Sequence, residues 1–187
     1  MNRGLHSWSR FKLAQACLLF GLDARGMEIL NELVVHDPEY QPAWSSLGFL
    51  HSRAGRYDAA IAAFEHALVV HPDDDAVLFN LGYTLQRAGR HEQAIERMQR
   101  AVERNRFLDR AWYGAGISLM HLGRLEEALH HLQEAARLQP MNPYAGYQLG
   151  AALFKLGRYD EVRAEYERVK GFDPKIAEQM RRDFGVL

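Results

Sequence analysis

The sequence predicts an all-α solenoid of five tandem helix–turn–helix repeats, each 34 residues long, followed by a C-terminal capping helix. Two observations predict this fold. Small residues recur at a fixed spacing of 34, which is typical of repeat architectures. Apolar residues on either side of each recurring glycine follow helical spacing, so each repeat contains two amphipathic helices. The repeats expected are 41–74, 75–108, 109–142 and 143–176, preceded by a more degenerate copy at 7–40.

Two glycine positions and one alanine position define the repeat. The fifteenth residue is glycine followed by arginine, and glycine there tolerates a positive φ that ends the first helix in a left-handed cap. Glycine at the eighth position and alanine at the twentieth keep the facing surfaces shallow, so the two helices can approach closely. These residues are Gly48, Gly82, Gly116 and Gly150 at the eighth position, Gly55, Gly89, Gly123 and Gly157 at the fifteenth, and Ala60, Ala94 and Ala128 at the twentieth.

The first copy, 7–40, departs from this pattern but keeps its register. Ala14 stands in place of the eighth-position glycine, Gly21 holds the turn, and Gly26 stands where alanine is expected. Cys17 falls inside the first helix of this copy, at a position held by leucine in most of the others. We therefore expect a buried, chemically quiet thiol.

The end of the chain predicts a helix that closes the array at 174–184. A single helix pair buries only one face, so such repeats are stable when stacked and need solvated ends. Ile176, Met180 and Phe184 recur at i, i+4 and i+8, whereas Glu178 and Arg181 lie on the other side. This pattern favours a capping helix with one apolar and one charged face.

Composition excludes several classes of protein. The formal net charge is −1, which argues against a strongly polybasic nucleic-acid binder. One cysteine allows neither an intramolecular disulfide nor a cysteine-based zinc framework. Nothing approaches the ~18 consecutive apolar residues of a membrane-spanning helix. Arg10 and Lys12 interrupt the apolar run near the N-terminus, so it does not form a signal peptide. We expect a cytoplasmic protein without nucleic-acid partners or membrane insertion.

The histidines, glycines and serines of the sequence form no known catalytic or metal-binding motif. His91-Glu92 has no second histidine at the spacing of a zinc-protease helix. His130 and His131 are adjacent, so they point about 100° apart on a helix and cannot share a metal. There is no phosphate-binding glycine loop and no nucleophile elbow. The sequence therefore predicts no enzyme, no metal site and no cofactor.

The repeat resembles the tetratricopeptide repeat family. The pattern Trp44-x-x-Leu47-Gly48 … Gly55-x-Tyr57-x-x-Ala60 … Phe64-x-x-Ala67 … Pro72 follows the family signature, and the resemblance covers residues 7–176. His51 and Arg106 are departures from it. The resemblance implies a right-handed superhelix, here a single domain over residues 1–187. It also implies a non-catalytic adaptor or co-chaperone-like module, whose first helices line a concave groove for a peptide of a partner protein.

Residues of the first helices that the inter-helix core does not use are the candidates for the groove. They predict an aromatic floor and a cationic edge, which suits a segment mixing apolar anchors with acidic residues or a terminal carboxylate. Alternatively, some of these aromatic side chains pack against the next repeat. The candidates are Phe49, Arg53, Phe79, Asn80, Tyr83, Arg87, Arg110, Tyr113, Ile117, His121, Tyr144, Tyr147 and Lys155.

The sequence bears on three further interpretations. Some family members grip a terminal carboxylate with a Lys/Asn/Arg set, of which only Asn80 and Arg110 match here, so we expect this clamp to be absent. Arg97, Arg100 and Arg104 share one helix face and form either a docking patch or a solvated surface. The alternative to peptide binding is a scaffold that homo-oligomerises through its repeats.

Overall fold

The computed structural model describes residues 3–186, and within that range the chain forms eleven helices and no strand. Residues 1, 2 and 187 of the expected single domain lie outside the described range. The helices are α1 (Arg3–Leu19), α2 (Asp23–His36), α3 (Gln41–Arg53), α4 (Tyr57–Val70), α5 (Asp75–Arg87), α6 (His91–Arg104), α7 (Asp109–His121), α8 (Leu125–Leu138), α9 (Pro143–Lys155), α10 (Tyr159–Lys170) and α11 (Pro174–Phe184).

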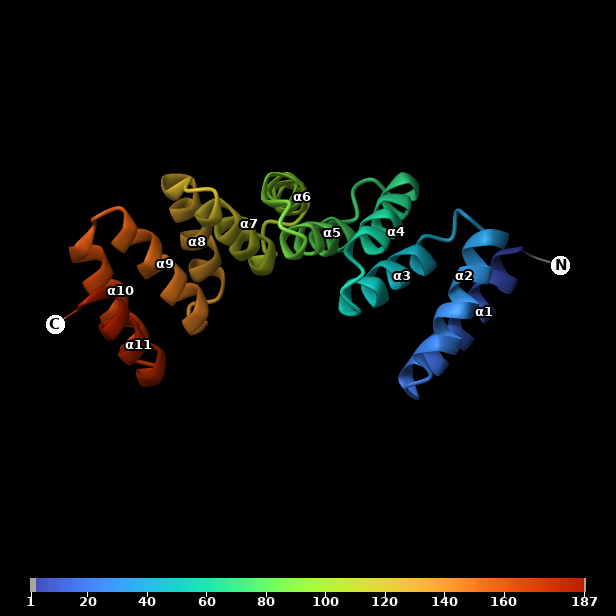
Figure 1. Ribbon diagram of the computed structural model, residues 1–187, viewed down its shortest axis with the longest axis horizontal. Coiled ribbons are helices and arrows are strands. Elements are labelled where there is room, and N and C mark those ends of the chain that lie inside the picture. Colours follow the sequence, from blue (N-terminus) through green and yellow to red (C-terminus); the bar gives the residue numbers. More distant parts are fainter. Residues whose placement is uncertain (1–2, 187) are drawn as a thin grey trace.

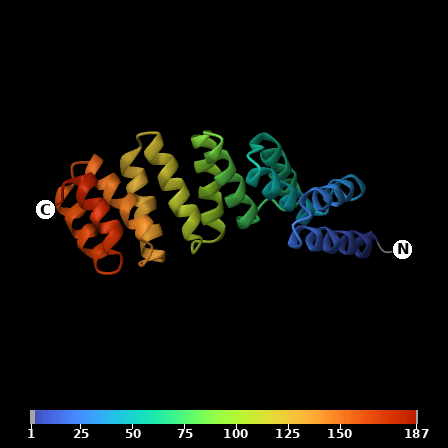
Figure 2. The same ribbon diagram turned by 60° about the horizontal axis from the view of Figure 1, so that its bottom comes forward.

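The helices pair in chain order, and each pair from α1/α2 to α9/α10 is one of the five repeats expected from the sequence. Figure 1 shows the pairs following one another along an arch, with the two chain ends at opposite extremes and α4 and α6 on its outer side. Figure 2 shows the same pairs standing side by side in a row. The predicted all-α solenoid is confirmed.

Each turn within a repeat uses a left-handed glycine. Gly21, Gly55, Gly89, Gly123 and Gly157 have φ between 73° and 76°, and no other residue type has positive φ in the described range. The arginine that follows can reach back to the preceding repeat. Arg90 lies 2.6 Å from the carboxylate of Asp58, although both side chains are largely exposed, so the pair contributes little stability.

Glycine at the eighth position brings the two helices of a repeat into close contact. A Cβ at Gly48 would lie 2.7 Å from the ring of Phe64, and one at Gly82 would lie 2.7 Å from Met98. The first repeat exchanges the two small residues: Ala14 is fully buried, and a Cβ at Gly26 would lie 2.7 Å from Leu18. The degenerate copy therefore keeps the close approach with the glycine on its second helix.

The C-terminal helix α11 covers the last repeat as predicted. A Cβ at Gly150 would lie 2.8 Å from Met180, so α11 supplies the large neighbour in this repeat. Ala177 and Met180 are buried, whereas Glu178 and Arg181 are exposed. Cys17 is half-buried and packs on the core of the first repeat. None of the described helices is long and apolar enough to cross a membrane.

Candidate functional site

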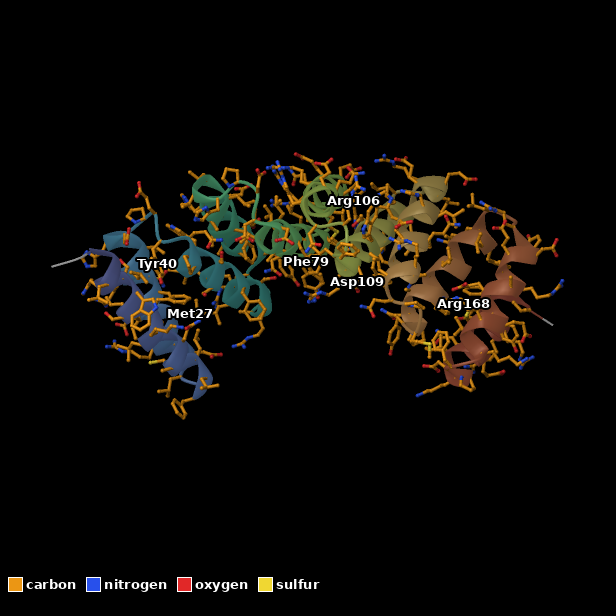
Figure 3. The ribbon with its side chains drawn as sticks, turned by 180° about the vertical axis from the view of Figure 1, so that it is seen from behind. Met27, Tyr40, Phe79, Arg106, Asp109 and Arg168 are labelled. Carbon is orange, nitrogen blue, oxygen red and sulfur yellow. The ribbon has the colours of Figure 1, made fainter. Side chains whose placement is uncertain are left out.

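The inner surface of α3, α5 and the start of α7 forms a groove with a volume of about 530 Å³. In Figure 3, Phe79 lies at the inner side of the arch and Arg106 at its outer side. The lining residues come from the second, third and fourth repeats, so side chains from three consecutive repeats meet in one concavity. Seven of the thirteen residues expected from the sequence line it: Phe49, Arg53, Phe79, Asn80, Tyr83, Arg87 and Arg110.

Helical spacing on α5 builds the floor of the groove. Phe79, Tyr83 and Arg87 are four residues apart, so they stand one above another on the same face of the helix. The rings of Phe79 and Tyr83 stack with centroids 6.4 Å apart. Tyr83 is 42% exposed, and Phe49, which faces the groove from α3, is 54% exposed. The floor thus offers accessible aromatic surface.

Two arginines lie over the aromatic rings of the groove. The Cζ atom of Arg110 is 5.0 Å from the ring centroid of Phe79. The Cζ atom of Arg87 is 5.8 Å from the ring of Tyr57 and 6.0 Å from that of Tyr83, whose hydroxyl accepts a 3.2 Å hydrogen bond from Arg87 Nη1. Stacking on a ring leaves the edge of the guanidinium plane available to donate hydrogen bonds.

The groove is electropositive. Its lining contains three arginines and no carboxylate. Arg53 forms an ion pair with Asp23 of the first repeat. Across residues 3–186, by contrast, no carboxylate forms an ion pair with Arg87 or Arg110. Two cations that the protein does not neutralise therefore border an aromatic floor.

A second hollow of about 460 Å³ extends the groove toward the N-terminal repeat. It shares Phe49, Arg53 and Asn80 with the first hollow, and adds apolar side chains from α1. One of them, Leu19, is 82% exposed. The concave surface therefore passes from a cationic, aromatic centre to an apolar end.

The sequence did not single out Tyr57, Ser52 or Thr84 for this site. Tyr57 belongs to the second helix of its repeat, but it is the first residue of α4, so it reaches the groove beside the turn. A 2.9 Å hydrogen bond between the hydroxyl groups of Thr84 and Ser52 joins the groove walls of α5 and α3. The position of Tyr57 beside a left-handed glycine turn was the available signal.

The other six expected residues lie outside the groove. Tyr113 packs partly buried against the core of the last repeats, and burial raises the pKa of its hydroxyl. Tyr147 donates a 2.7 Å hydrogen bond to Asp183 of the capping helix, which also raises the pKa of Tyr147. The remaining four are Ile117, which is half-buried; His121, whose ring stacks on that of His91 at 4.6 Å; Tyr144, which is 64% exposed; and Lys155, which is exposed.

The basic run on α6 joins neighbouring repeats. Arg104 lies 2.8 Å from Asp73, and Arg100 lies 3.9 Å from the same carboxylate. Arg100 also donates a 3.1 Å hydrogen bond to the carbonyl of Pro72. These arginines therefore contact the loop between the second and third repeats.

No cluster of three or more histidine, cysteine or acidic side chains suited to a metal ion occurs among the described residues. The adjacent His130 and His131 both contact the ring of Trp112, with centroids 5.9 Å and 5.3 Å away. His131 also hydrogen-bonds to the carbonyl of Glu127 through Nδ1, and burial lowers the pKa of its imidazole. These two histidines therefore belong to the packing between α7 and α8.

Comparison with known proteins defines the family. Three sequence models of the tetratricopeptide repeat match residues 40–106, 79–143 and 119–181, and overlap to cover most of the chain. The chain belongs to the tetratricopeptide repeat family, whose members act as protein–protein interaction modules.

Among solved structures, the fold is similar to that of two crystal structures of MamA. One has 17% identity and a TM-score of 0.85 over 98% of both chains; the other has 19% identity and a TM-score of 0.83 over 88% of this chain and 96% of that one. YrrB, described as a TPR protein with an unusual peptide-binding site, has 21% identity and a TM-score of 0.78 over 92% of this chain and 90% of its own. PilF of Pseudomonas aeruginosa has 18% identity and a TM-score of 0.78 over 98% of this chain and 86% of its own. No curated protein matches the chain in sequence.

Proposed function

We propose that the protein is a non-catalytic adaptor that binds an acidic, partly apolar peptide segment of a partner protein in the groove of α3, α5 and α7. The observation that carries the proposal is the pair Arg87 and Arg110. Both guanidinium groups lie over aromatic rings, and neither has a carboxylate partner in residues 3–186. Arginine in this setting binds carboxylates through charge-assisted hydrogen bonds.

The rest of the groove supports the apolar part of the ligand. Phe49 and Tyr83 offer aromatic surface beside the arginines, and the hollow that reaches Leu19 offers aliphatic surface at one end. Tyrosine and arginine are residue types that often contribute most of the binding energy at interfaces. Peptide binding by YrrB, which has the same fold, is consistent with this proposal. We expect a dissociation constant of about 1 μM, which corresponds to a binding free energy of about −8 kcal/mol.

The absence of catalytic motifs in the sequence supports the non-catalytic part of the proposal, and a cytoplasmic location is part of the same proposal. No cofactor is required for this function. The ligand chemistry follows from the groove alone.

Selection of peptides tests the proposal. A random dodecapeptide display library is selected on the purified chain, and the consensus peptide is synthesised with a fluorophore for anisotropy titration. We expect enrichment of aspartate or glutamate next to an aromatic or aliphatic residue. Arg87→Gln combined with Arg110→Gln should weaken binding at least about tenfold, because each removes a charge-assisted hydrogen bond.

Arg106→Gln is the matched control, since Arg106 is an exposed arginine on the outer side of the arch. It should leave the affinity unchanged, and urea unfolding should be the same for all variants. Selected peptides without acidic residues would contradict the proposal. So would an affinity that the double substitution does not change.

A further inference from the structure

Neighbouring repeats touch at a recurring pair of positions. At the first three junctions, the residue that begins the second helix of a repeat lies against the residue that ends the first helix of the next repeat. At the first junction, Asp23 forms an ion pair with Arg53. At the second, the Cζ atom of Arg87 lies 5.8 Å from the ring centroid of Tyr57. Each of these two contacts therefore includes an arginine, whose charge does not change near neutral pH.

The third junction is closed by two histidines. The rings of His91, at the start of α6, and His121, at the end of α7, stack with centroids 4.6 Å apart and an angle of 10° between their planes. His121 is exposed, whereas His91 is half-buried and its Nδ1 atom is buried with no hydrogen-bond partner among residues 3–186. The fourth junction has Leu125 and Lys155 at these positions. Histidine is the side chain that ordinarily titrates between pH 5 and 8, so the third junction is the one that acidification in this range can change.

This stack accommodates one proton but not two. A charged ring over a neutral ring is an attractive arrangement, whereas two positive charges 4.6 Å apart repel each other. The helix dipoles make the two sites unequal, because His121 lies at the C-terminal end of α7 and His91 at the N-terminal end of α6. A positive charge is favoured at a C-terminal end and disfavoured at an N-terminal end. His121 therefore takes up the first proton on acidification, and His91 takes up the second.

The surroundings of the pair do not neutralise the second proton. Burial lowers the pKa of His91, and the neighbouring His121 lowers it further, whereas Glu92 beside it has a smaller, opposite effect. The other charged groups that flank the pair, on α5, on α8 and in the two turns, are engaged in contacts of their own: Arg87 with Tyr57, Arg90 with Asp58, and Arg124 with Glu127. The repulsion between two charged imidazoles therefore acts on the contact between α6 and α7.

We propose that the stack of His91 and His121 is a pH-sensitive junction between the third and fourth repeats, closed near neutral pH and open when both imidazoles carry a proton. A second contact limits the extent of the opening. The side-chain amide of Gln86 on α5 donates hydrogen bonds of 2.9 Å to the carbonyl of Gly114 and of 2.8 Å to the hydroxyl of Ser118, both on α7. None of these groups titrates, so α7 stays attached to α5 while its C-terminal end separates from the start of α6. Because each repeat contacts only its neighbours, the change stays at this junction.

Histidine titration by NMR tests the coupling between the two rings. In the parent chain, His91 should titrate at lower pH than His121. His121→Phe keeps an aromatic ring over His91 but removes the charge, so the titration midpoint of His91 should rise by at least about 0.5 pH unit. The exposed His71 is the internal reference and should not shift. An unchanged midpoint of His91 would overturn the proposal.

Hydrogen exchange tests whether the junction opens. His91→Tyr combined with His121→Arg is the matched control, because it installs the residue types of Tyr57 and Arg87 at the preceding junction. Exchange is compared at about pH 7.5 and about pH 5, after correction for the intrinsic pH dependence of amide exchange. In the parent, protection in the first turns of α6 and the last turn of α7 should fall at least about fivefold at the lower pH. The double variant should keep this protection at both pH values.

Two results of the exchange experiment would overturn the proposal. If the parent keeps its protection at about pH 5, the exposed ring of His121 only swings into solvent and the junction stays closed. If the parent and the double variant lose protection equally, another group is the cause. Protonation of His131 on α8 occurs in both chains, so it cancels in their comparison. Neither measurement includes a peptide, and both therefore stand independently of ligand binding in the groove.

Discussion

The guanidinium of Arg110, at the start of α7, lies over the ring of Phe79 on α5, with 5.0 Å between Cζ and the ring centroid. This contact joins the first helices of two neighbouring repeats across the floor of the groove. Because the guanidinium lies over the ring, its position is restricted before a ligand arrives. An ordered fork loses less entropy on binding a carboxylate than a free side chain does.

Replacement of Arg110 by lysine tests the value of this orientation. Lysine keeps the charge but loses the planar fork and most of the stacking, so we expect Arg110→Lys to bind the acidic consensus peptide about fivefold more weakly, or about 1 kcal/mol. Fluorescence anisotropy measures the change. Arg106→Lys on the outer side is the control and should have no effect. Equal affinity in Arg110→Lys would mean that charge alone recruits the ligand.

The contact between Gly48 and Phe64 predicts a specific loss of stability. In Gly48→Ala, the new Cβ would lie 2.7 Å from two ring carbons of Phe64, so the ring or the helices must move. We expect a destabilisation of about 1–3 kcal/mol, from urea unfolding. The same position in the next two repeats faces Met98 and Leu132 in place of phenylalanine.

A second substitution provides the control for this packing argument. Phe64→Leu makes room for the added methyl group, so Gly48→Ala combined with Phe64→Leu should lose less stability than the sum of the two single changes. If the two losses simply add, the close contact is not the cause of the effect.

The sequence predicted the repeat boundaries and the turn glycines because both depend on backbone geometry that recurs every 34 residues. It did not predict which candidate groove residues share one surface. Tyr83 and Tyr147 occupy related faces of their repeats, yet Tyr83 borders the groove while Tyr147 is covered by α11. A repeat pattern treats all copies as equivalent, whereas the capping helix makes the last copy different.

The first repeat illustrates another limit of the pattern. The close approach of α1 and α2 is kept, but the glycine sits on α2 at Gly26 and the alanine on α1 at Ala14. When the five repeats are written beneath one another, both residues depart from the pattern. Only the close contact between α1 and α2 shows that the two departures compensate each other. The exposure of Leu13 shows a related limit. The equivalent residues of the later repeats are buried by the repeat that precedes each of them, so burial at this position depends on stacking and not on the residue's own repeat.

The imidazole of His131 predicts how stability depends on pH. Burial lowers the pKa of His131 below its ordinary value of 6.5, with a smaller contribution from His130. The unfolded chain therefore takes up a proton on acidification before the folded protein does. The stabilising contribution is complete above about pH 6.5 and is lost as the pH falls toward the lowered pKa of the folded state.

Urea unfolding at pH values between about 7.5 and about 5 checks this prediction. Stability should fall on acidification, and the fall should be smaller in His131→Leu than in the parent. It should not vanish, because burial also lowers the pKa of His51 and of His91. His71→Gln, at an exposed position, should keep the dependence of the parent. An unchanged slope in His131→Leu would contradict the assignment.

Met180 on α11 predicts how much the last repeat depends on its cap. Its side chain is fully buried, and a Cβ at Gly150 would lie 2.8 Å from its terminal methyl carbon. Met180→Ala should cost about 3 kcal/mol, because it leaves a cavity between α9 and α11. Since each repeat contacts only its neighbours, the loss of stability should be largest in α9, α10 and α11.

Hydrogen exchange should therefore show faster amide exchange in α9, α10 and α11 of Met180→Ala, while α5 and α6 keep the protection of the parent. Met141→Ala, at a position that is 68% exposed, should change neither region. Uniform acceleration along the whole chain would instead mean that the solenoid unfolds as one unit and that the cap stabilises all of its repeats equally.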